Sequence, residues 1–378
     1  MSESAQPIQV LLLCADADAT TQVREAFGRF SKSRNRFTLE HLDRCQTGMG
    51  RIARGGVDAV LLVPDLPDAN GLDSLRKLRS QSAQIPIVLV TQNEDDDLGF
   101  QSLHNGAQDF LSIGEGLVVS LPRAIRFAIE RRRAEATEGQ LELAHSIQQR
   151  LFPKEPPKLP GYDVAAVCYP ASVTAGDYYD FFPICDGTAG MVVADVSGHG
   201  FGPALLMSET RAYLRALSRT CADIGEILAN VNLIMAEDTA PDQFVTLFFA
   251  QLDVSRRRLN YCGAGQNAYL IEAPGTVSTL DSTSMPLAVD RDELFQLTRH
   301  VHLSVGDVLV LMTDGVVETR NAVGDLLGVR RALEVVRRHT DKPSSDIVHL
   351  IYEEVRGFAG ARLQDDDITI LVVKVVDT

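Results

Sequence analysis

The segment Gly306-Asp-Val-Leu-Val-Leu-Met-Thr-Asp-Gly-Val-Val-Glu318 decides the fold of the carboxy-terminal half of the chain. Its apolar run 308–312 is typical of a buried strand, and the Asp-Gly pair that begins at Asp314 follows the strand directly. Further strand-like runs stand at 191–196, 245–252 and 368–373. Because strands come in consecutive groups and helices come separately, this half is expected to be an antiparallel sheet structure with helices packed outside it.

The clearest helix of this half is indicated by an apolar stripe with helical spacing. The stripe consists of Ile224, Ile227, Leu228, Val231, Ile234 and Met235. Residues three and four positions apart lie on one face of a helix, so we expect this face to pack on the core.

The first 120 residues alternate apolar runs with helical patterns. The apolar runs are 10–14, 37–42, 59–63, 87–90 and 109–111. Between two of them, Leu72, Leu75 and Leu78 have helical spacing directly after the turn cluster at 67–71. The alternation predicts an α/β domain with a five-stranded parallel, doubly wound sheet.

A long helix is predicted between the two halves. From Pro122 to about Gln149 the chain is strongly charged, and apolar residues then recur every four positions at Leu143, Ile147 and Leu151. The proline-rich segment 153–157 ends the helix, because prolines lack a backbone donor and fix the backbone.

We therefore expect an amino-terminal domain at 1–121, a linker helix within 122–158 and a carboxy-terminal domain at 159–378. The helix is either a solvated connector or a coiled coil that pairs with its copy in a homodimer. Gly139 and the polar residues before it weaken the heptad pattern.

Composition excludes several classes of protein. Lys and Arg number 36 against 51 Asp and Glu, and the net charge of −15 disfavours binding to nucleic acid or to an anionic membrane. The 6 cysteines form no C-x-x-C pair, which argues against a zinc knuckle or a disulfide framework and favours the cytoplasm. The apolar runs are too short to span a bilayer, and we expect no signal peptide.

Aspartates at the edges of strands carry the chemistry of the second half. They occur in Gly-Asp177-Tyr-Tyr, Ala-Asp195-Val-Ser-Gly-His-Gly, Thr-Asp314-Gly and Asp-Asp366-Asp-Ile-Thr. Converging carboxylates repel one another and raise their own pKa values unless cations compensate them. Because hard ions prefer oxygen donors, the set indicates two divalent cations, Mg²⁺ or Mn²⁺.

These motifs carry a resemblance to a known family. From about residue 140 onward the chain resembles the metal-dependent (PPM-type) Ser/Thr protein phosphatases of the SpoIIE-type, RsbU-like branch. The matching elements are Ala144-His-Ser-Ile-Gln-Gln-Arg-Leu-Phe-Pro153, Gly176-Asp-Tyr-Tyr-Asp-Phe-Phe, Asp195-Val-Ser-Gly-His-Gly, Ala264-Gly-Gln-Asn, 306–318 and Asp366-Asp-Ile-Thr. The resemblance implies a β-sandwich flanked by helices, and a bacterial signalling enzyme whose substrate is a phosphoprotein, namely an anti-sigma-factor antagonist in a partner-switching pathway.

The same resemblance implies a role for each matching residue. Asp195 bridges two metal ions, Asp177 and the Val196 carbonyl help to hold one of them, and Asp314 and Asp366 hold the other. A water between the ions then attacks phosphorus in line, without a phosphoenzyme.

Other residues near these motifs have open roles. Asp180 and Asp367 either orient water or are purely structural. His199 is a candidate acid for the leaving oxygen, but its place in a glycine turn favours a role in backbone geometry. Gln266 stands where the family commonly has His, and Ala288 where it commonly has Gly; neither is an expected ligand.

Residues 8 to about 120 resemble a response-regulator receiver domain. Pro67, Gly71 and the segment 106–111 anchor the comparison. The phosphoacceptor position holds Val63, and the position of the expected lysine holds Ile113. No phosphoacceptor is therefore expected, because phosphoryl transfer needs a carboxylate nucleophile and a cation to hold the product.

Two further positions complete the receiver comparison. The acidic pair after the first strand is reduced to Ala15-Asp16, whereas Thr91 is retained. Asp65 is the remaining alternative acceptor, although Pro64 and its position at the strand end disfavour it. The domain is expected to act in docking or dimerisation and to control the phosphatase without being phosphorylated.

Two functions fit the sequence. The first is a phosphatase acting on a phosphoserine or phosphothreonine protein, and the second is a non-catalytic module that sequesters a partner. The receiver positions are lost whereas every expected phosphatase ligand is present, and this asymmetry favours the enzyme.

Overall fold

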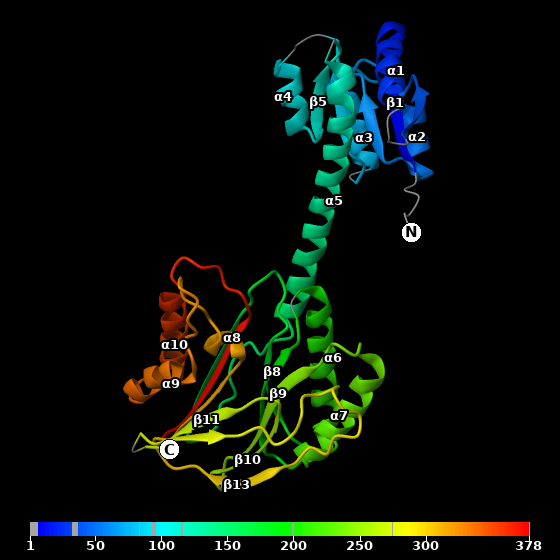
Figure 1. Cartoon of the computed structure of the whole chain (residues 1–378). Coiled ribbons are helices and arrows are strands. Elements are labelled where there is room, and N and C mark those ends of the chain that lie inside the picture. The colour runs from blue at the N-terminus through cyan, green and yellow to red at the C-terminus, as the bar shows by residue number, and fades with distance from the viewer. Residues whose placement is uncertain are drawn as a thin grey trace. The chain divides into compact units, whose positions relative to one another are not determined.

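The computed structural model describes residues 7–31, 37–82, 84–92, 96–114, 116–198, 200–273 and 275–377. The chain divides into two compact units, Met1–Gln140 and Leu141–Thr378 (Figure 1). Among the described residues, no helix is both long and apolar enough to cross a membrane.

The amino-terminal unit contains a five-stranded parallel sheet in the order β2-β1-β3-β4-β5. Its strands are β1 (Ile8–Leu13), β2 (Phe37–Leu42), β3 (Ala59–Leu62), β4 (Ile87–Thr91) and β5 (Asp109–Ser112). The helices are α1 (Ala17–Ser31), α2 (Cys45–Ala53), α3 (Leu72–Gln81) and α4 (Asp96–His104). Alternate residues of each strand pack into separate hydrophobic cores on the two faces of the sheet. Leu12, for example, lies in the core on one face and Leu11 in the core on the other. The predicted five-stranded parallel, doubly wound sheet is confirmed, and its strand order is that of flavodoxin-like folds.

Helix α5 (Leu117–Gln149) starts earlier than the pattern predicts and includes Pro122. Leu117, Leu121 and Ile125 are buried in the core of the amino-terminal unit. Burial of this apolar stripe outweighs the backbone hydrogen bond that Pro122 cannot make, so tertiary packing begins the helix before its predicted start at the proline.

The carboxy-terminal unit is a sandwich of two five-stranded antiparallel sheets. One sheet contains β7 (Tyr178–Pro183), β8 (Ala189–Val196), β9 (Val245–Asp253), β10 (Arg258–Ala264) and β13 (Thr298–His302). The other contains β6 (Tyr162–Tyr169), β11 (Ala268–Ile271), β12 (Val277–Leu280), β14 (Val308–Met312) and β15 (Ile368–Val375). Val193 and Phe248 of the first sheet share a core with Leu309 and Leu371 of the second, which confirms the predicted sandwich.

Helices cover the outer faces of the sandwich. Helices α6 (Phe201–Leu217) and α7 (Ile224–Asp238) lie on one side, and α9 (Val329–Arg338) and α10 (Ser344–Ala359) on the other (Figure 1). The short helix α8 (Asp314–Val317) follows β14 directly. The predicted α7 stripe is buried except for Ile234, which is 36% exposed; the buried face is therefore narrower than the pattern predicts.

Candidate active site

Two of the predicted ligands, Asp314 and Asp366, are brought together by close packing of Gly315 against the backbone of Asp367. A Cβ added to Gly315 would lie 1.9 Å from the carbonyl oxygen of Asp367. Only glycine allows the backbone after Asp314 to approach the backbone after Asp366 this closely. Strands β14 and β15 are antiparallel neighbours, so the end of β14 and the start of β15 lie at the same end of the strand pair.

The other two predicted ligands face each other across neighbouring strands. Tyr178 pairs with Ala194, which places Asp177 beside Asp195 at the ends of β7 and β8. The Asp177 carboxyl lies close enough to Asp195 to act on its pKa. The loop before Asp177 packs tightly, because a Cβ on Gly176 would lie 3.2 Å from the Val196 carbonyl oxygen.

Thr313 links these two pairs. Its Oγ1 donates a hydrogen bond of 2.8 Å to Asp177 Oδ2, and it accepts one of 3.1 Å from the Thr369 backbone N–H. Asp177 is 1% exposed. The contact ties a buried carboxylate on one sheet to the Asp314 segment on the other. Sequence reasoning missed Thr313, although it directly precedes Asp314.

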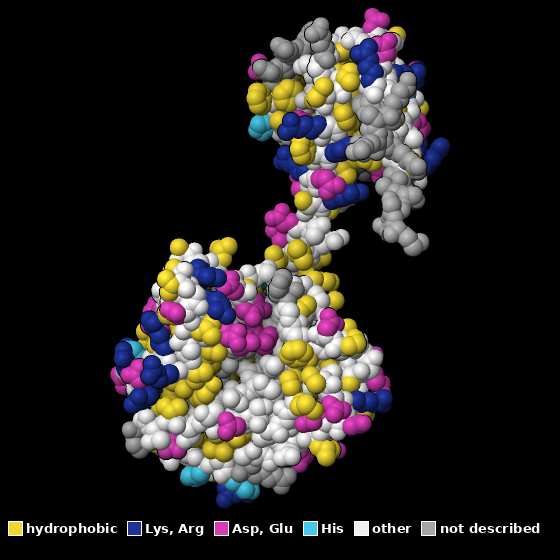
Figure 2. Space-filling view, viewed as in Figure 1, with side chains coloured by type: hydrophobic (Ala, Val, Ile, Leu, Met, Phe, Trp, Pro, Cys, Tyr) yellow, Lys and Arg dark blue, Asp and Glu magenta, His cyan; other side chains and the backbone are white. Residues whose placement is uncertain are grey.

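The carboxylates strongly perturb one another. Burial, together with the negative charges of Asp314 and Asp366, raises the pKa of Asp195 to about 7. Burial, and then the charge of Asp195, raises the pKa of Asp177 well above its ordinary value. Desolvation also raises the pKa of Asp314 and of Asp366. Figure 2 shows acidic side chains gathered in a hollow of the carboxy-terminal unit.

The donor set matches the chemistry of a hard divalent cation, since it consists of carboxylate and carbonyl oxygens. Among the described residues, no three His, Cys, Asp or Glu side chains are already arranged to hold one ion together. The backbone therefore brings the expected ligands into one region, while their side chains do not form a closed three-carboxylate cage.

Asp180 and Asp367 have clear structural partners. Asp180 accepts hydrogen bonds of 2.5 and 2.6 Å from Arg215 and one of 2.5 Å from the Tyr178 hydroxyl. Asp367 accepts backbone hydrogen bonds of 2.7 Å from Ala171 and 2.6 Å from Gly176. Both side chains brace the site through these contacts. His199 lies outside the described residues.

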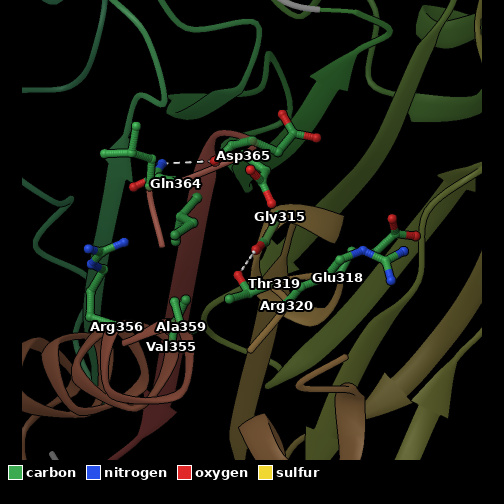
Figure 3. A pocket seen from close by; sticks show the side chains of 12 residues that line it. Gly315, Glu318, Thr319, Arg320, Val355, Arg356, Ala359, Gln364 and Asp365 are labelled. Carbon is green, nitrogen blue, oxygen red and sulfur yellow. Dashed lines mark hydrogen bonds between the residues drawn. The ribbon is translucent and has the colours of Figure 1, made fainter. Parts of the chain in front are cut away.

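A pocket of about 160 Å³ adjoins the acidic cluster. Figure 3 shows Arg356 and Ala359 of α10 on one side of it and Gly315 and Thr319 on the other. The Thr319 hydroxyl donates a hydrogen bond of 2.6 Å to the Gly315 carbonyl, which holds the turn after Asp314.

The two acidic residues near the phosphoacceptor position of the receiver domain, Asp16 and Asp65, each accept a hydrogen bond from a backbone N–H group. Asp16 Oδ1 accepts a hydrogen bond of 2.7 Å from the Ala19 backbone N–H at the start of α1. Asp65 has a φ of 68° and accepts one of 2.8 Å from the Gly71 backbone N–H. The acceptor position itself holds the buried Val63.

Comparison with known proteins identifies both parts of the chain. The family described as Stage II sporulation protein E (SpoIIE) matches residues 185–376, half of the chain. The chain belongs to the SpoIIE family. The response regulator receiver domain family matches residues 13–112, so this SpoIIE-family chain also carries a receiver domain.

Several curated proteins are similar to this SpoIIE-family chain. Phosphoserine phosphatase RsbU of Bacillus subtilis is 27% identical over 240 residues, which cover 63% of this chain and 70% of RsbU. Phosphoserine phosphatase RsbP of the same organism is 25% identical over 63% of this chain and 58% of its own length. Protein IcfG of Synechocystis is 28% identical over 62% of this chain, which spans 41% of IcfG.

Solved structures agree with the fold. The SiaA-PP2C domain of Pseudomonas aeruginosa superimposes with a TM-score of 0.57 and 23% identity, covering 64% of this chain and 98% of that domain. The RsbU and RsbW domains of Rv1364c from Mycobacterium tuberculosis give a TM-score of 0.50 and 25% identity, covering 58% of this chain and 61% of that one. Relatives named phosphoserine phosphatases support the enzyme class expected for this SpoIIE-family chain, a protein serine/threonine phosphatase.

Proposed function

We propose that this SpoIIE-family chain is a metal-dependent phosphatase that hydrolyses a phosphoserine or phosphothreonine protein, and that its metal site consists of Asp177, Asp195, Val196, Asp314 and Asp366. The observation that carries the proposal is the convergence of aspartates from separate segments of sequence, where burial and then their mutual repulsion raise the pKa of Asp195 to about 7. Such a costly arrangement is typical of functional sites rather than of structural ones.

The expected ligands divide into two groups around Asp195. Asp177 and the Val196 carbonyl would help to hold one ion, and Asp314 and Asp366, whose charges help to raise the Asp195 pKa, would hold the other, with Asp195 between them. When bound, two divalent cations would supply an activated water and neutralise charge on the phosphoryl oxygens. The ions are Mg²⁺ or Mn²⁺, since every donor is an oxygen.

The residues of the chain itself fix the expected ligands in place. Thr313 holds the Asp177 carboxylate through its hydroxyl, so that one oxygen is oriented by the protein. Gly315 and Gly176 permit the close backbone approaches on the two sides of the site. Asp314 and Asp366 already act on each other, because the charge of Asp314 helps to raise the pKa of Asp366 after the larger effect of burial.

The proposed substrate is an anti-sigma-factor antagonist in a bacterial partner-switching pathway. RsbU and RsbP, two of the similar proteins, are named phosphoserine phosphatases. The cytoplasm is the proposed location, because all six cysteines are free thiols, as is usual in a reducing compartment.

The phosphatase would be regulated by the amino-terminal part of the chain. The proposed division is a phosphorylation-independent receiver domain at 1–121, a linker at 122–158 and the phosphatase domain at 159–378.

The linker helix would join two copies of the chain in a homodimer, since Leu143 and Ile147 are 62% and 54% exposed. Light scattering should give a dimeric mass for the wild type and a lower mass for Ile147→Glu. A monomeric wild type would refute the dimer.

Hydrolysis of a phosphoserine protein in Mn²⁺ tests the proposed activity. Asp314→Ala should lower turnover by orders of magnitude and leave the fold intact, because it removes an expected metal ligand. Asp341→Ala, which changes an exposed loop aspartate, is the matched control and should retain the wild-type rate. Wild-type hydrolysis by Asp314→Ala would show that the metal assignment is wrong.

A further inference from the structure

Gln148, near the end of α5, forms an unusual pair of contacts with the backbone of one residue. Its side chain is 4% exposed. The Nε2 atom donates a hydrogen bond of 2.7 Å to the Ala175 carbonyl, and the Oε1 atom accepts one of 2.9 Å from the Ala175 backbone N–H. The side-chain amide therefore satisfies both polar backbone groups of Ala175, much as a neighbouring strand would do.

Ala175 stands two residues before Asp177, and the residue between them is held from the other side. Asp367 Oδ2 accepts a hydrogen bond of 2.6 Å from the Gly176 backbone N–H and a longer one of 3.3 Å from the Asp177 backbone N–H. The segment 175–177 thus lies between the amide of Gln148 and the carboxylate of Asp367. These contacts fix the backbone from which the Asp177 side chain projects.

Both polar backbone groups held by Gln148 are buried. Ala175 is fully buried, so loss of the Gln148 amide would leave a buried N–H and a buried carbonyl without these partners. Movement of the segment toward other donors and acceptors would relieve this penalty. A movement at Gly176 would also disturb its packing beside the carbonyl of Val196, another expected ligand, which leaves only 3.2 Å to a Cβ added at position 176.

The chain after Gln148 is held as well. Arg211 Nε of α6 donates a hydrogen bond of 2.9 Å to the Leu151 carbonyl, just beyond the end of α5. Gln148 is therefore presented to Ala175 from a helix end that is itself anchored to the phosphatase domain.

We propose that Gln148 is a positioning residue for metal binding. Its amide binds both polar backbone groups of Ala175, and it thereby fixes the position of the Asp177 carboxylate relative to the Val196 carbonyl. The inference rests on the proposed metal site and names a support of that site that lies on the linker helix. It assigns Gln148 no contact with substrate or with the ions.

Three variants of the full-length chain test the proposal. Gln148→Ala removes both contacts, and Gln148→Glu keeps an acceptor for the Ala175 N–H but loses the donor to its carbonyl. Gln149→Ala is the matched control, because it changes the same residue type at the exposed next position of the same helix. Mn²⁺ binding is measured by titration calorimetry well below the melting temperature of each variant, and the Mn²⁺ concentration for half-maximal hydrolysis is measured in parallel.

We expect Mn²⁺ to bind about 10-fold or more weakly to Gln148→Ala and Gln148→Glu than to the wild type, the range typical of residues that orient metal ligands. Gln149→Ala should bind as the wild type does. A purely structural role would lower only the melting temperature and leave Mn²⁺ affinity unchanged, and that result would overturn the proposal. If Gln148→Ala does not fold, wild-type affinity in Gln148→Glu overturns it equally.

The binding measurement separates this inference from the proposed function. A wild type that binds Mn²⁺ but hydrolyses no phosphoserine protein would refute the phosphatase and leave the effect of Gln148 on binding to be judged by calorimetry. A wild type that binds no Mn²⁺ would overturn both.

Discussion

Gly315 packs so tightly against Asp367 that a Cβ at position 315 would lie 1.9 Å from the Asp367 carbonyl oxygen. This contact joins the end of β14 to the start of β15 and so places Asp314 near Asp366. The glycine of the Asp-Gly pair is therefore required by packing, whereas in an isolated turn it would supply only conformational freedom.

Gly315→Ala should consequently impair the site and the fold together. We expect a loss of about 1–3 kcal/mol in unfolding free energy from overpacking and a loss of about 100-fold in hydrolysis from displacement of the ligands. Denaturant unfolding and phosphate release measure the two effects. Gly357→Ala, in open space on α10, is the control and should gain about 0.5–1 kcal/mol. Equal behaviour of the two variants would contradict the packing account.

The raised pKa of Asp195 predicts a pH dependence of stability in the metal-free chain. The folded chain holds this proton up to a pKa of about 7, whereas the unfolded chain loses it near the ordinary value of about 4. The folded state binds more protons in this window, so the free energy of unfolding should fall as the pH rises from about 4 to about 7. Chemical denaturation in a chelator tests this. Asp195→Asn should flatten the dependence, and an unchanged slope would refute the role of Asp195.

The same pKa predicts that protons compete with metal. Below a pH of about 7, binding of an ion must displace the proton of Asp195, so apparent affinity for Mn²⁺ should fall by up to about 10-fold per pH unit for that proton. Calorimetry at pH 6 and pH 8 measures the difference. Equal affinity at both values would show that Asp195 is not a ligand.

Ala288 adopts a φ of 69°, a conformation that glycine tolerates better. The strain explains physically why glycine is favoured at this position. Ala288→Gly should therefore stabilise the chain by about 1 kcal/mol, measured by denaturant unfolding. The control Ala361→Gly, at an exposed position whose φ is not positive, should give no gain. A loss of stability in Ala288→Gly would contradict the explanation.

The receiver domain should not be phosphorylated. Val63 occupies the acceptor position, and Asp65 is bound to the Gly71 backbone in a left-handed conformation. After incubation with acetyl phosphate and Mg²⁺, the intact mass of the chain should be unchanged. A stable gain of one phosphoryl group that Asp65→Asn abolishes would identify Asp65 as a displaced acceptor.

The sequence was sufficient to predict the fold class, because the hydrophobic periodicity, the order of strands and helices along the chain and the loop residues agree with one another. It failed at Pro122, the predicted start of the linker helix, because burial of Leu117 and Leu121 begins the helix before the proline. It also failed to show what supports the site. Gln148 lies within a quoted motif, but its partner Ala175 is 27 residues away in the chain, and only the folded backbone reveals the pairing.

The roles of Asp180 and Asp367 could be decided only from the structure, for the same reason. Asp367 directly follows the expected ligand Asp366, and Asp180 lies in the same short motif as Asp177, so local spacing cannot distinguish a metal ligand from a structural residue. The ion pair of Asp180 with Arg215 and the backbone contacts of Asp367 depend on distant segments.

Release of inorganic phosphate from a phosphoserine-bearing anti-sigma-factor antagonist, followed over time with the full chain, tests the central claim most directly. We predict release that depends on Mn²⁺ or Mg²⁺, stops when a chelator is added and resumes when the ion is restored. Release that continues unchanged in the chelator would contradict metal-dependent hydrolysis. No release from any phosphoserine or phosphothreonine protein in either ion, by a folded chain, would contradict the assignment of a phosphatase.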